Sequence, residues 1–221
     1  ILICTIWGST WLAIKIGLET MTPLISAGRR FLVASTLWFA LIVIRGVKIP
    51  WNHGERWFYL VVSLTSFSIP FALVYWGEQY IPSGLTSIIF AIYPFTVALF
   101  SFLFLPDEKI TVWKISGIVL GFIGVFTIFS NNLTASNPRA LWGMGAVLAS
   151  AILQGYSVIV IKRHGHSIHP FVITFVPMLI GATILLSASM FFEDLSGIRF
   201  TPHALLAIHT SDYAFIEENA F

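Results

Sequence analysis

Four ionisable side chains lie within or at the edge of long apolar runs of the sequence: Lys15, Arg29, Arg30 and Glu78. A full charge inside hydrocarbon costs about 2.5 to 3.5 kcal/mol on insertion scales, so such a group usually faces a partner, a cavity or a transport pathway. Snorkelling, or a local i,i+4 pair between Lys15 and Glu19, is the alternative for Lys15 and Arg29. Adjacent arginines point about 100° apart on a helix, so at most one faces a bundle interior squarely. Arg30 and Glu78 are the favoured candidates for a substrate or proton site.

A short polar stretch, Trp7-Gly8-Ser9-Thr10, falls in the middle of the first apolar run. Serine and threonine hydroxyls can bond a ligand there, and the face of a tryptophan can hold a cation or a ring. The alternative is that Ser9 and Thr10 bond back to their own helix and that Trp7 faces lipid. Trp7, Ser9 and Thr10 therefore join the candidate substrate-binding residues.

Prolines interrupt two further apolar runs. Pro70 and Pro94 each remove a backbone hydrogen bond from a helix, and the resulting kink can frame a cavity or a hinge, with simple bending as the alternative. Tyr93 places a hydroxyl beside Pro94, and both join the candidate binding residues. A glycine stripe in a later run favours close helix packing over a ligand role: Gly117, Gly121 and Gly124.

Other patterns give little support to metal or enzyme chemistry. His164, His166 and His169 have metal-like spacing, but no acidic or thiol side chain accompanies them, so no metal site is predicted. Cys4 is the single cysteine, which excludes an intramolecular disulfide. We find no nucleophile and base pair, phosphate loop or zinc-protease motif, and we predict neither an enzyme nor a cofactor. The 12 Lys+Arg residues are scattered, which disfavours nucleic-acid binding.

The candidate residues lie in a chain whose composition is that of a membrane-spanning protein. Of its 221 residues, 57% are hydrophobic and 10% are charged, whereas a soluble domain carries about 25% charged residues. A helix crosses a bilayer with roughly 20 apolar residues, and the runs lack the polar alternation of outer-membrane strands. The predicted fold is an all-α polytopic membrane protein with seven transmembrane helices, which occupy or are bounded by residues 1–18, 24–44, 56–78, 78–107, 114–139, 139–162 and 169–193.

Alternate loops differ in charge, which predicts an orientation. One set of loops carries most of the bases: Arg45, Lys48, Arg56, Lys109, Lys114, Lys162 and Arg163. The other set carries Glu19, Glu78, Glu193 and Asp194, with Arg139 and Arg199 as its bases. Because Lys and Arg near short loops stay in the cytoplasm, the N-terminus is predicted to be cytoplasmic and the membrane to be a prokaryotic plasma membrane. Five tryptophans fall near predicted span ends, where an indole fits the interface: Trp51, Trp57, Trp76, Trp113 and Trp142.

An internal repeat is indicated by a gap-free shift that places Pro23 on Pro170 and Lys15 on Lys162. The shift aligns few identical residues, and a composition so rich in apolar residues produces some identities by chance. A repeat of five spans would enter the membrane from opposite sides in its two copies, as in inverted-repeat transporters. The chain begins inside an apolar run at Ile1, so we expect a fragment. The last stretch is expected to be a truncated or replaced eighth span.

Three stretches resemble one family: WGSTWLAIKIGLETMTPLISAGRRFLVA, GEQYIPSGLTSIIFAIYPFTVALF and LPDEKITVWKISGIVLGFIGVF. In composition and order they are similar to the first five spans of EamA-type permeases in the drug/metabolite transporter (DMT) superfamily. The resemblance implies two inverted five-helix repeats, ten spans in all, with a central solute cavity. It divides the chain into a first EamA repeat at 1–130, a linker at 131–140, the start of a second repeat at 141–200 and an aberrant tail at 201–221.

The resemblance also implies a function and its residues. Family pattern positions fall on Trp7 to Thr10, Arg30, Glu78, Gln79, Pro94 and Glu108, and Glu108 is expected to be structural. The implied activity is secondary transport or export of small organic solutes, such as amino acids, metabolites or drugs, by alternating access in the lipid bilayer. A non-transporting membrane scaffold or assembly subunit is the alternative. The sequence leaves open the substrate, the direction, a coupling proton or ion, and a homodimer.

Overall fold

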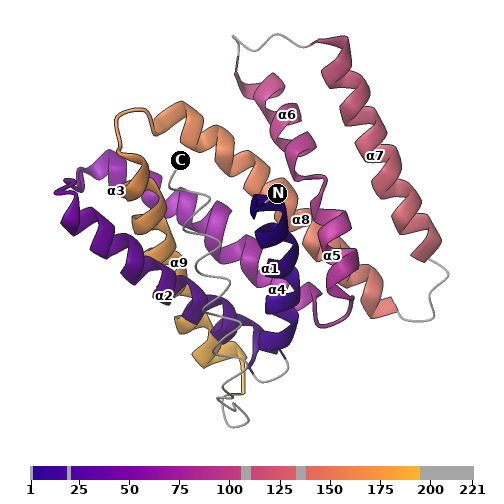
Figure 1. The fold of residues 1–221 in the computed structure, drawn as a ribbon, viewed down its shortest axis with the longest axis horizontal. Coiled ribbons are helices and arrows are strands. Elements are labelled where there is room, and N and C mark those ends of the chain that lie inside the picture. The colour runs from indigo at the N-terminus through magenta and orange to yellow at the C-terminus, as the bar shows by residue number, and fades with distance from the viewer. Residues whose placement is uncertain (1, 19–20, 106–110, 133–137, 195–221) are drawn as a thin grey trace.

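The computed structural model describes residues 2–18, 21–105, 111–132 and 138–194, with the backbone alone at residues 2–9 and at several positions of 114–132. Within these ranges all regular structure is helical (Figure 1), which confirms the all-α prediction. The helices are α1 (Leu2–Leu18), α2 (Pro23–Ile44), α3 (His53–Val62), the π-helix η1 (Ser63–Ser68), α4 (Ile69–Gly77), α5 (Ser83–Phe90), α6 (Tyr93–Phe104), α7 (Val112–Asn132), α8 (Pro138–His164) and α9 (Pro170–Phe192).

Five helical segments of the described chain are long and apolar enough to cross a membrane. They are Pro23–Ile44, His53–Gly77, Ser83–Phe104, Pro138–His164 and Pro170–Phe192. The predicted first and fifth spans correspond to α1, with 17 residues, and α7, with 21 residues, whose side chains the structure describes only in part. The protein is an all-helical polytopic membrane protein.

Both interior prolines stand at an irregularity in a span. Pro70 lies in the first turn of α4, directly after the π-helix, and Pro94 lies in the first turn of α6, after a turn at Ala91 and Ile92. A proline is tolerated in a first turn because the amide there has no intrahelical acceptor. Pro94 therefore begins a new helical segment after a turn, whereas Pro70 lies in a helix that continues from His53 to Gly77 and changes only its hydrogen-bond pattern at the π-helix.

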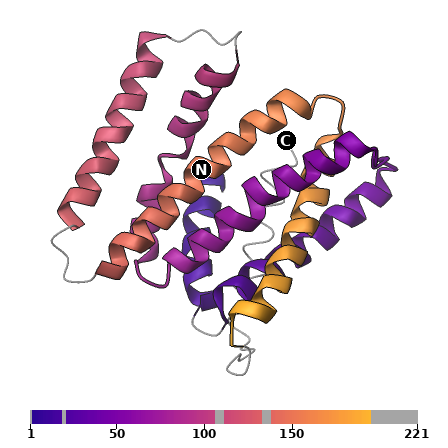
Figure 2. The ribbon, with the colours of Figure 1, turned by 180° about the vertical axis from the view of Figure 1, so that it is seen from behind.

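The helices α2 and α9 form the most extensive helix pair among the described elements, and they run antiparallel (Figures 1 and 2). Trp38, late in α2, contacts Phe171 at the start of α9, with ring centroids 5.3 Å apart. Helix α2 then ends at Gly46, whose φ of 61° favours glycine, and the amides of Gly46 and Val47 close the helix end. This cap turns the chain from α2 into the segment that leads to α3.

Helix α8 packs against both α4 and α6, and glycine lets it approach α4 closely. A Cβ added to Gly143 would lie 2.9 Å from the carbonyl oxygen of Gly77. Helix α7 lies at the edge of the bundle beside α6 in both views (Figures 1 and 2). In the predicted glycine stripe of α7, Gly117 and Gly121 face Phe95 of α6, but a Cβ on Gly124 would meet no described atom within 4 Å, so the packing prediction is wrong for Gly124.

Candidate functional site

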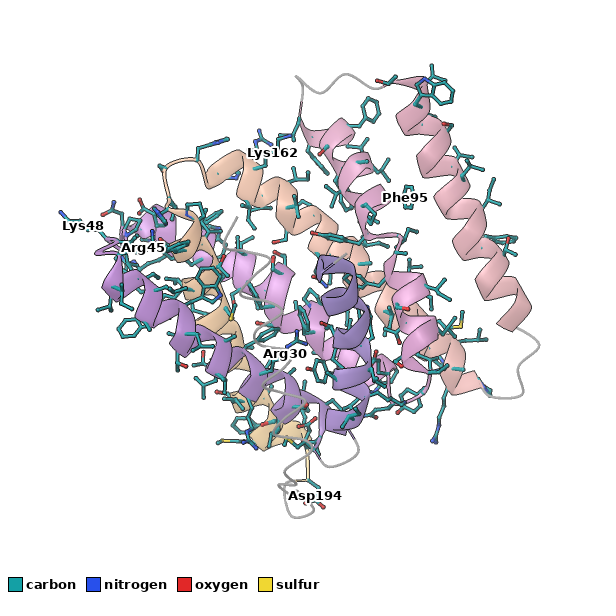
Figure 3. All side chains as sticks on the ribbon, viewed as in Figure 1. Arg30, Arg45, Lys48, Phe95, Lys162 and Asp194 are labelled. Carbon is teal, nitrogen blue, oxygen red and sulfur yellow. The ribbon has the colours of Figure 1, made fainter. Side chains whose placement is uncertain are left out.

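Two oppositely charged side chains are buried in the bundle. Arg30 of α2 has an exposed fraction of 4%, and Glu78, directly after α4, has an exposed fraction of 0%. Arg29, the neighbour of Arg30, is only half-buried, so the structure answers which arginine faces inward. Figure 3 places Arg30 in the middle of the molecule, between the basic end of the bundle and Asp194 at the other end.

Several polar atoms of these two side chains lack hydrogen-bond partners within the described chain: Nη1 of Arg30 and both carboxyl oxygens of Glu78. The guanidinium of Arg30 instead lies 5.9 Å from the ring centroid of Phe71, within cation–π range. A buried polar group without a partner costs about 1 to 3 kcal/mol, so such groups are retained where something else needs them. The unpaired atoms make this pair the strongest candidate for a solute or proton site.

Glu78 lies just beyond the span that ends at Gly77. Burial raises the pKa of its carboxyl to about 8, while the hydroxyl of Thr86 and the positive charges of Lys15 and Arg30 oppose the rise. These opposing groups come from α5, α1 and α2. The carboxyl of Glu78 is therefore surrounded by groups from three other helices, and it can gain or lose a proton near neutral pH.

Lys15 has a defined structural partner. Its ammonium donates hydrogen bonds to the backbone carbonyls of Glu78 and Ile81, the latter at 3.3 Å. A cation at the carboxyl end of a helix satisfies carbonyls that have no intrahelical donor and favours the helix dipole. Lys15 thus closes the end of α4 and holds the turn that carries Glu78. Glu19, the partner considered from sequence, lies outside the described residues.

Two other predicted site residues lie in or beside a row of aromatic contacts. Tyr93 is half-buried and stacks on Phe90, which in turn contacts Trp11 of α1 at 4.9 Å. Pro94 is exposed, and Thr10 is half-buried one residue before Trp11. This aromatic row therefore joins α1, α5 and α6 beside the break in span 4. The side chains of Trp7 and Ser9, and all of Glu108, lie outside what the structure describes.

Gln79 is exposed and lines a pocket of about 500 Å³, separate from its neighbour Glu78, which is not among the lining residues. The pocket lies where the start of α2, α4 and the end of α9 meet, and it is lined by Pro23, Leu24, Ile69, Ala72, Leu73, Trp76, Gln79, Phe192 and Glu193. Glu193 also accepts hydrogen bonds from the hydroxyl of Thr22 and from the amides of Leu24 and Ile25. Sequence reasoning assigned Glu193 only to a loop and missed this cap.

A hydroxyl cluster was also missed. In the π-helix, Thr65 donates to Ser157 of α8 at 3.0 Å and Ser66 lies 2.5 Å from the same hydroxyl. On the other side, Ser63 and Ser68 lie 3.5 Å apart, close to Gly181 of α9. The available signal was the run SLTSFS, which is unusually rich in hydroxyls for the middle of a span. Since π-helical turns are often found at functional sites, this segment is a candidate hinge of span 3.

The sequence and the fold that carry these irregular spans and buried ionisable groups can be compared with those of known proteins. Residues 1–130 match the EamA-like transporter family. The chain belongs to this family. The prediction made from the three sequence stretches is thereby confirmed at family level, and the protein is a membrane transporter of the drug/metabolite type. Because the matching family and a relative below are named as transporters, they support the prediction that the protein is not an enzyme.

Relatives in several bacteria extend the match beyond residue 130. The chain is 30% identical to Protein PagO of Salmonella typhimurium, over 93% of this chain and 67% of that protein. It is 33% identical to an uncharacterized transporter of Buchnera aphidicola, over 94% and 69%. A crystal structure with 16% sequence identity superposes with a TM-score of 0.71 and covers 96% of this chain and 75% of that one, which shows a shared fold.

Proposed function

We propose that this EamA protein transports small organic solutes, such as amino acids, metabolites or drugs, by alternating access across a plasma membrane. One observation carries the proposal: two buried ionisable side chains, Arg30 and Glu78, keep polar atoms without hydrogen-bond partners among the described residues. An intramembrane charge of this kind usually faces a substrate or an ion pathway. The guanidinium would bind an anionic group of the solute, and the carboxyl would bind a cationic group or a coupling proton.

The irregular hydrogen-bond patterns of spans 3 and 4 support alternating access. Span 3 changes from α-helix to π-helix and back to α-helix before it reaches Glu78, and span 4 breaks before Pro94. Transporter sites are commonly built at such breaks, because rigid segments on either side can rock against each other. Glu78 then lies at the end of a segment that can move relative to Arg30 on α2.

The charge distribution supports a cytoplasmic N-terminus. Arg45, Lys48 and Lys162 lie at one end of the bundle and Asp194 at the other (Figure 3). Loops rich in Lys and Arg are retained in the cytoplasm. With this end inside, α1 starts on the cytoplasmic side, and Glu78 lies at the outward-facing end of span 3.

Transport measured in proteoliposomes tests the proposal. We would follow uptake and efflux of radiolabelled amino acids and of a cationic dye by the wild type and by Arg30→Gln and Glu78→Gln. Both variants should lower transport of an accepted solute at least tenfold, because each removes a charge that the solute or the proton needs. Arg29→Gln, which neutralises the half-buried neighbour, is the matched control and should retain most of the activity.

Transport at wild-type rates by both buried-charge variants would remove Arg30 and Glu78 from the mechanism. Absence of transport by the wild type for every probe, in a protein that is folded in the same vesicles, would contradict the transport function itself. If Arg29→Gln lowers transport as much as Arg30→Gln does, the two arginines act through their positive charge at this depth and not through a binding site at Arg30.

A further inference from the structure

Basic side chains gather at one end of the described bundle, from two segments far apart in the sequence. Figure 3 shows Arg45 and Lys48 after α2, and Lys162 near the end of α8, at this end. We call the set the basic rim; it comprises Arg45, Lys48, His53, Arg56, Lys162, Arg163, His164, His166 and His169, all of them exposed. Five of the nine are Lys or Arg and carry a permanent positive charge.

The two segments of the rim are held together by packing. Trp38, near the end of α2, contacts Phe171 at the start of α9 with ring centroids 5.3 Å apart, which brings the ends of the two segments together. Helix α3, which begins at His53, contacts both α8 and α9. The bases therefore belong to one surface and are not two independent loops.

Negative charge at this end is scarce. Among the acidic residues that the structure describes, Glu55 alone lies within the rim, and it is half-buried and accepts a hydrogen bond from Asn52 at 3.3 Å. Glu193 and Asp194 lie beyond the other end of α9, and Glu78 is buried at the far end of span 3. Among the described residues, one acid therefore faces five Lys and Arg side chains, so this part of the surface carries a net positive charge that attracts anions.

Neighbouring apolar side chains place the rim at the level of lipid headgroups. Val43 and Ile44, the last residues of α2, are 62% and 76% exposed, as expected for apolar side chains that contact hydrocarbon. Trp51 and Trp57, which flank the start of α3, are also strongly exposed, as is typical of the aromatic belt at a membrane interface. The bases of the rim begin immediately beyond this apolar boundary, where phosphate groups of lipids lie.

We propose that the basic rim is a binding surface for anionic phospholipids, which it selects over zwitterionic ones through its permanent charges. Clusters of Lys and Arg directly beyond a membrane-spanning helix attract anionic lipids, and each base strengthens the association about fivefold near the surface. Exposed charges are screened by salt, so the preference depends on ionic strength. The rim would stabilise this end of the α2–α9 pair in a membrane that contains such lipids.

The test is the relative binding constant of two lipids, read from quenching of tryptophan fluorescence. The full chain would be reconstituted with brominated phosphatidylglycerol or brominated phosphatidylcholine; all eight tryptophans contribute to the signal, and the difference between the wild type and the variant below assigns the preference to the rim. In the wild type we expect phosphatidylglycerol to be preferred at least tenfold at low salt. The triple variant Arg45→Gln/Lys48→Gln/Arg56→Gln should lose most of that preference, because three charges at about fivefold each dominate it.

The matched control keeps the charge and changes the side chains: Arg45→Lys/Lys48→Arg/Arg56→Lys. It should bind phosphatidylglycerol as the wild type does. A neutral triple variant that retains the wild-type preference would overturn the proposal, and so would a charge-retaining triple variant that loses it. If the neutral triple variant fails to fold, the wild type still decides, since a preference that is unchanged between 50 mM and 500 mM salt would refute an electrostatic surface.

Discussion

Glu193→Gln should loosen the contact between the end of α9 and the start of α2. One oxygen of the Glu193 carboxylate accepts from the amide of Leu24 at 2.7 Å, and the other accepts from the hydroxyl of Thr22 at 2.6 Å and the amide of Ile25 at 3.2 Å. Glutamine keeps one acceptor oxygen, so one backbone amide at the helix start must lose its partner. The negative charge at the amino end of the α2 dipole is lost as well.

The magnitude follows from these two losses. An amide left without an acceptor costs about 1 to 3 kcal/mol, and the loss of a favourable charge at a helix start costs about 0.3 to 1 kcal/mol. We expect Glu193→Gln to destabilise the first turn of α2 by about 2 kcal/mol, which corresponds to a roughly 30-fold shift in its opening equilibrium.

Hydrogen exchange measures this shift directly. The amides of Leu24 and Ile25 should exchange about 30-fold faster in Glu193→Gln than in the wild type, with little change in the middle of α2. Asp194→Asn removes the same charge from the adjacent, exposed position and is the control. If the amides of Leu24 and Ile25 exchange at the same rate in Glu193→Gln as in the wild type, the cap is refuted. If Asp194→Asn accelerates their exchange as much as Glu193→Gln does, the effect comes from the lost charge alone and not from the hydrogen bonds of Glu193.

Three other perturbations test the packing and the proton site. Gly143→Ala should lower stability by about 1 to 3 kcal/mol in a thermal unfolding assay, because the new Cβ would lie 2.9 Å from the Gly77 carbonyl oxygen; Gly145→Ala, where no described atom lies within 4 Å, should be nearly neutral. Ser157→Ala should cost about 1 kcal/mol in the same assay, since it removes the hydroxyl partner of the π-helix; stability equal to the wild type would contradict that role. The Glu78 carboxyl has a pKa of about 8, so it is mostly protonated below that pH and ionised above it. The transport rate of the wild type should therefore change between pH 7 and 9, and the rate of Glu78→Gln should not.

The spans of this fold were predictable because bilayer thickness sets their length. Charged residues bound the apolar runs, and the observed α2 and α9 begin at Pro23 and Pro170, the two positions that the repeat shift aligned. The π-helix at Ser63–Ser68 could not be read in this way, since an apolar run indicates depth in the membrane but not the hydrogen-bond pattern inside it. The partners that stabilise it, Ser157 and Gly181, come from helices far along the chain.

The candidate site was predictable in part for a similar reason. The cost of a charge in hydrocarbon marked Arg30 and Glu78, and both are buried. The choice between Arg29 and Arg30 needed the rotation of α2 about its axis, which depends on α9. The partners of Lys15 are backbone carbonyls at the end of another helix, and backbone carbonyls leave no signature in a sequence.

These contacts divide the bundle into a fixed part and a part that can move. Helix α2 is held at its start by the carboxylate of Glu193 and near its end by the ring of Trp38 against Phe171, so the α2–α9 pair resists sliding. Span 3 contacts α8 through hydroxyls at its π-helix and through Gly77 and Gly143 at its end, and a hydroxyl pair can exchange partners without separating packed rings. Since Arg30 belongs to the fixed pair and Glu78 ends the movable span, a change in their separation is the motion through which we expect solute binding and alternating access to be coupled.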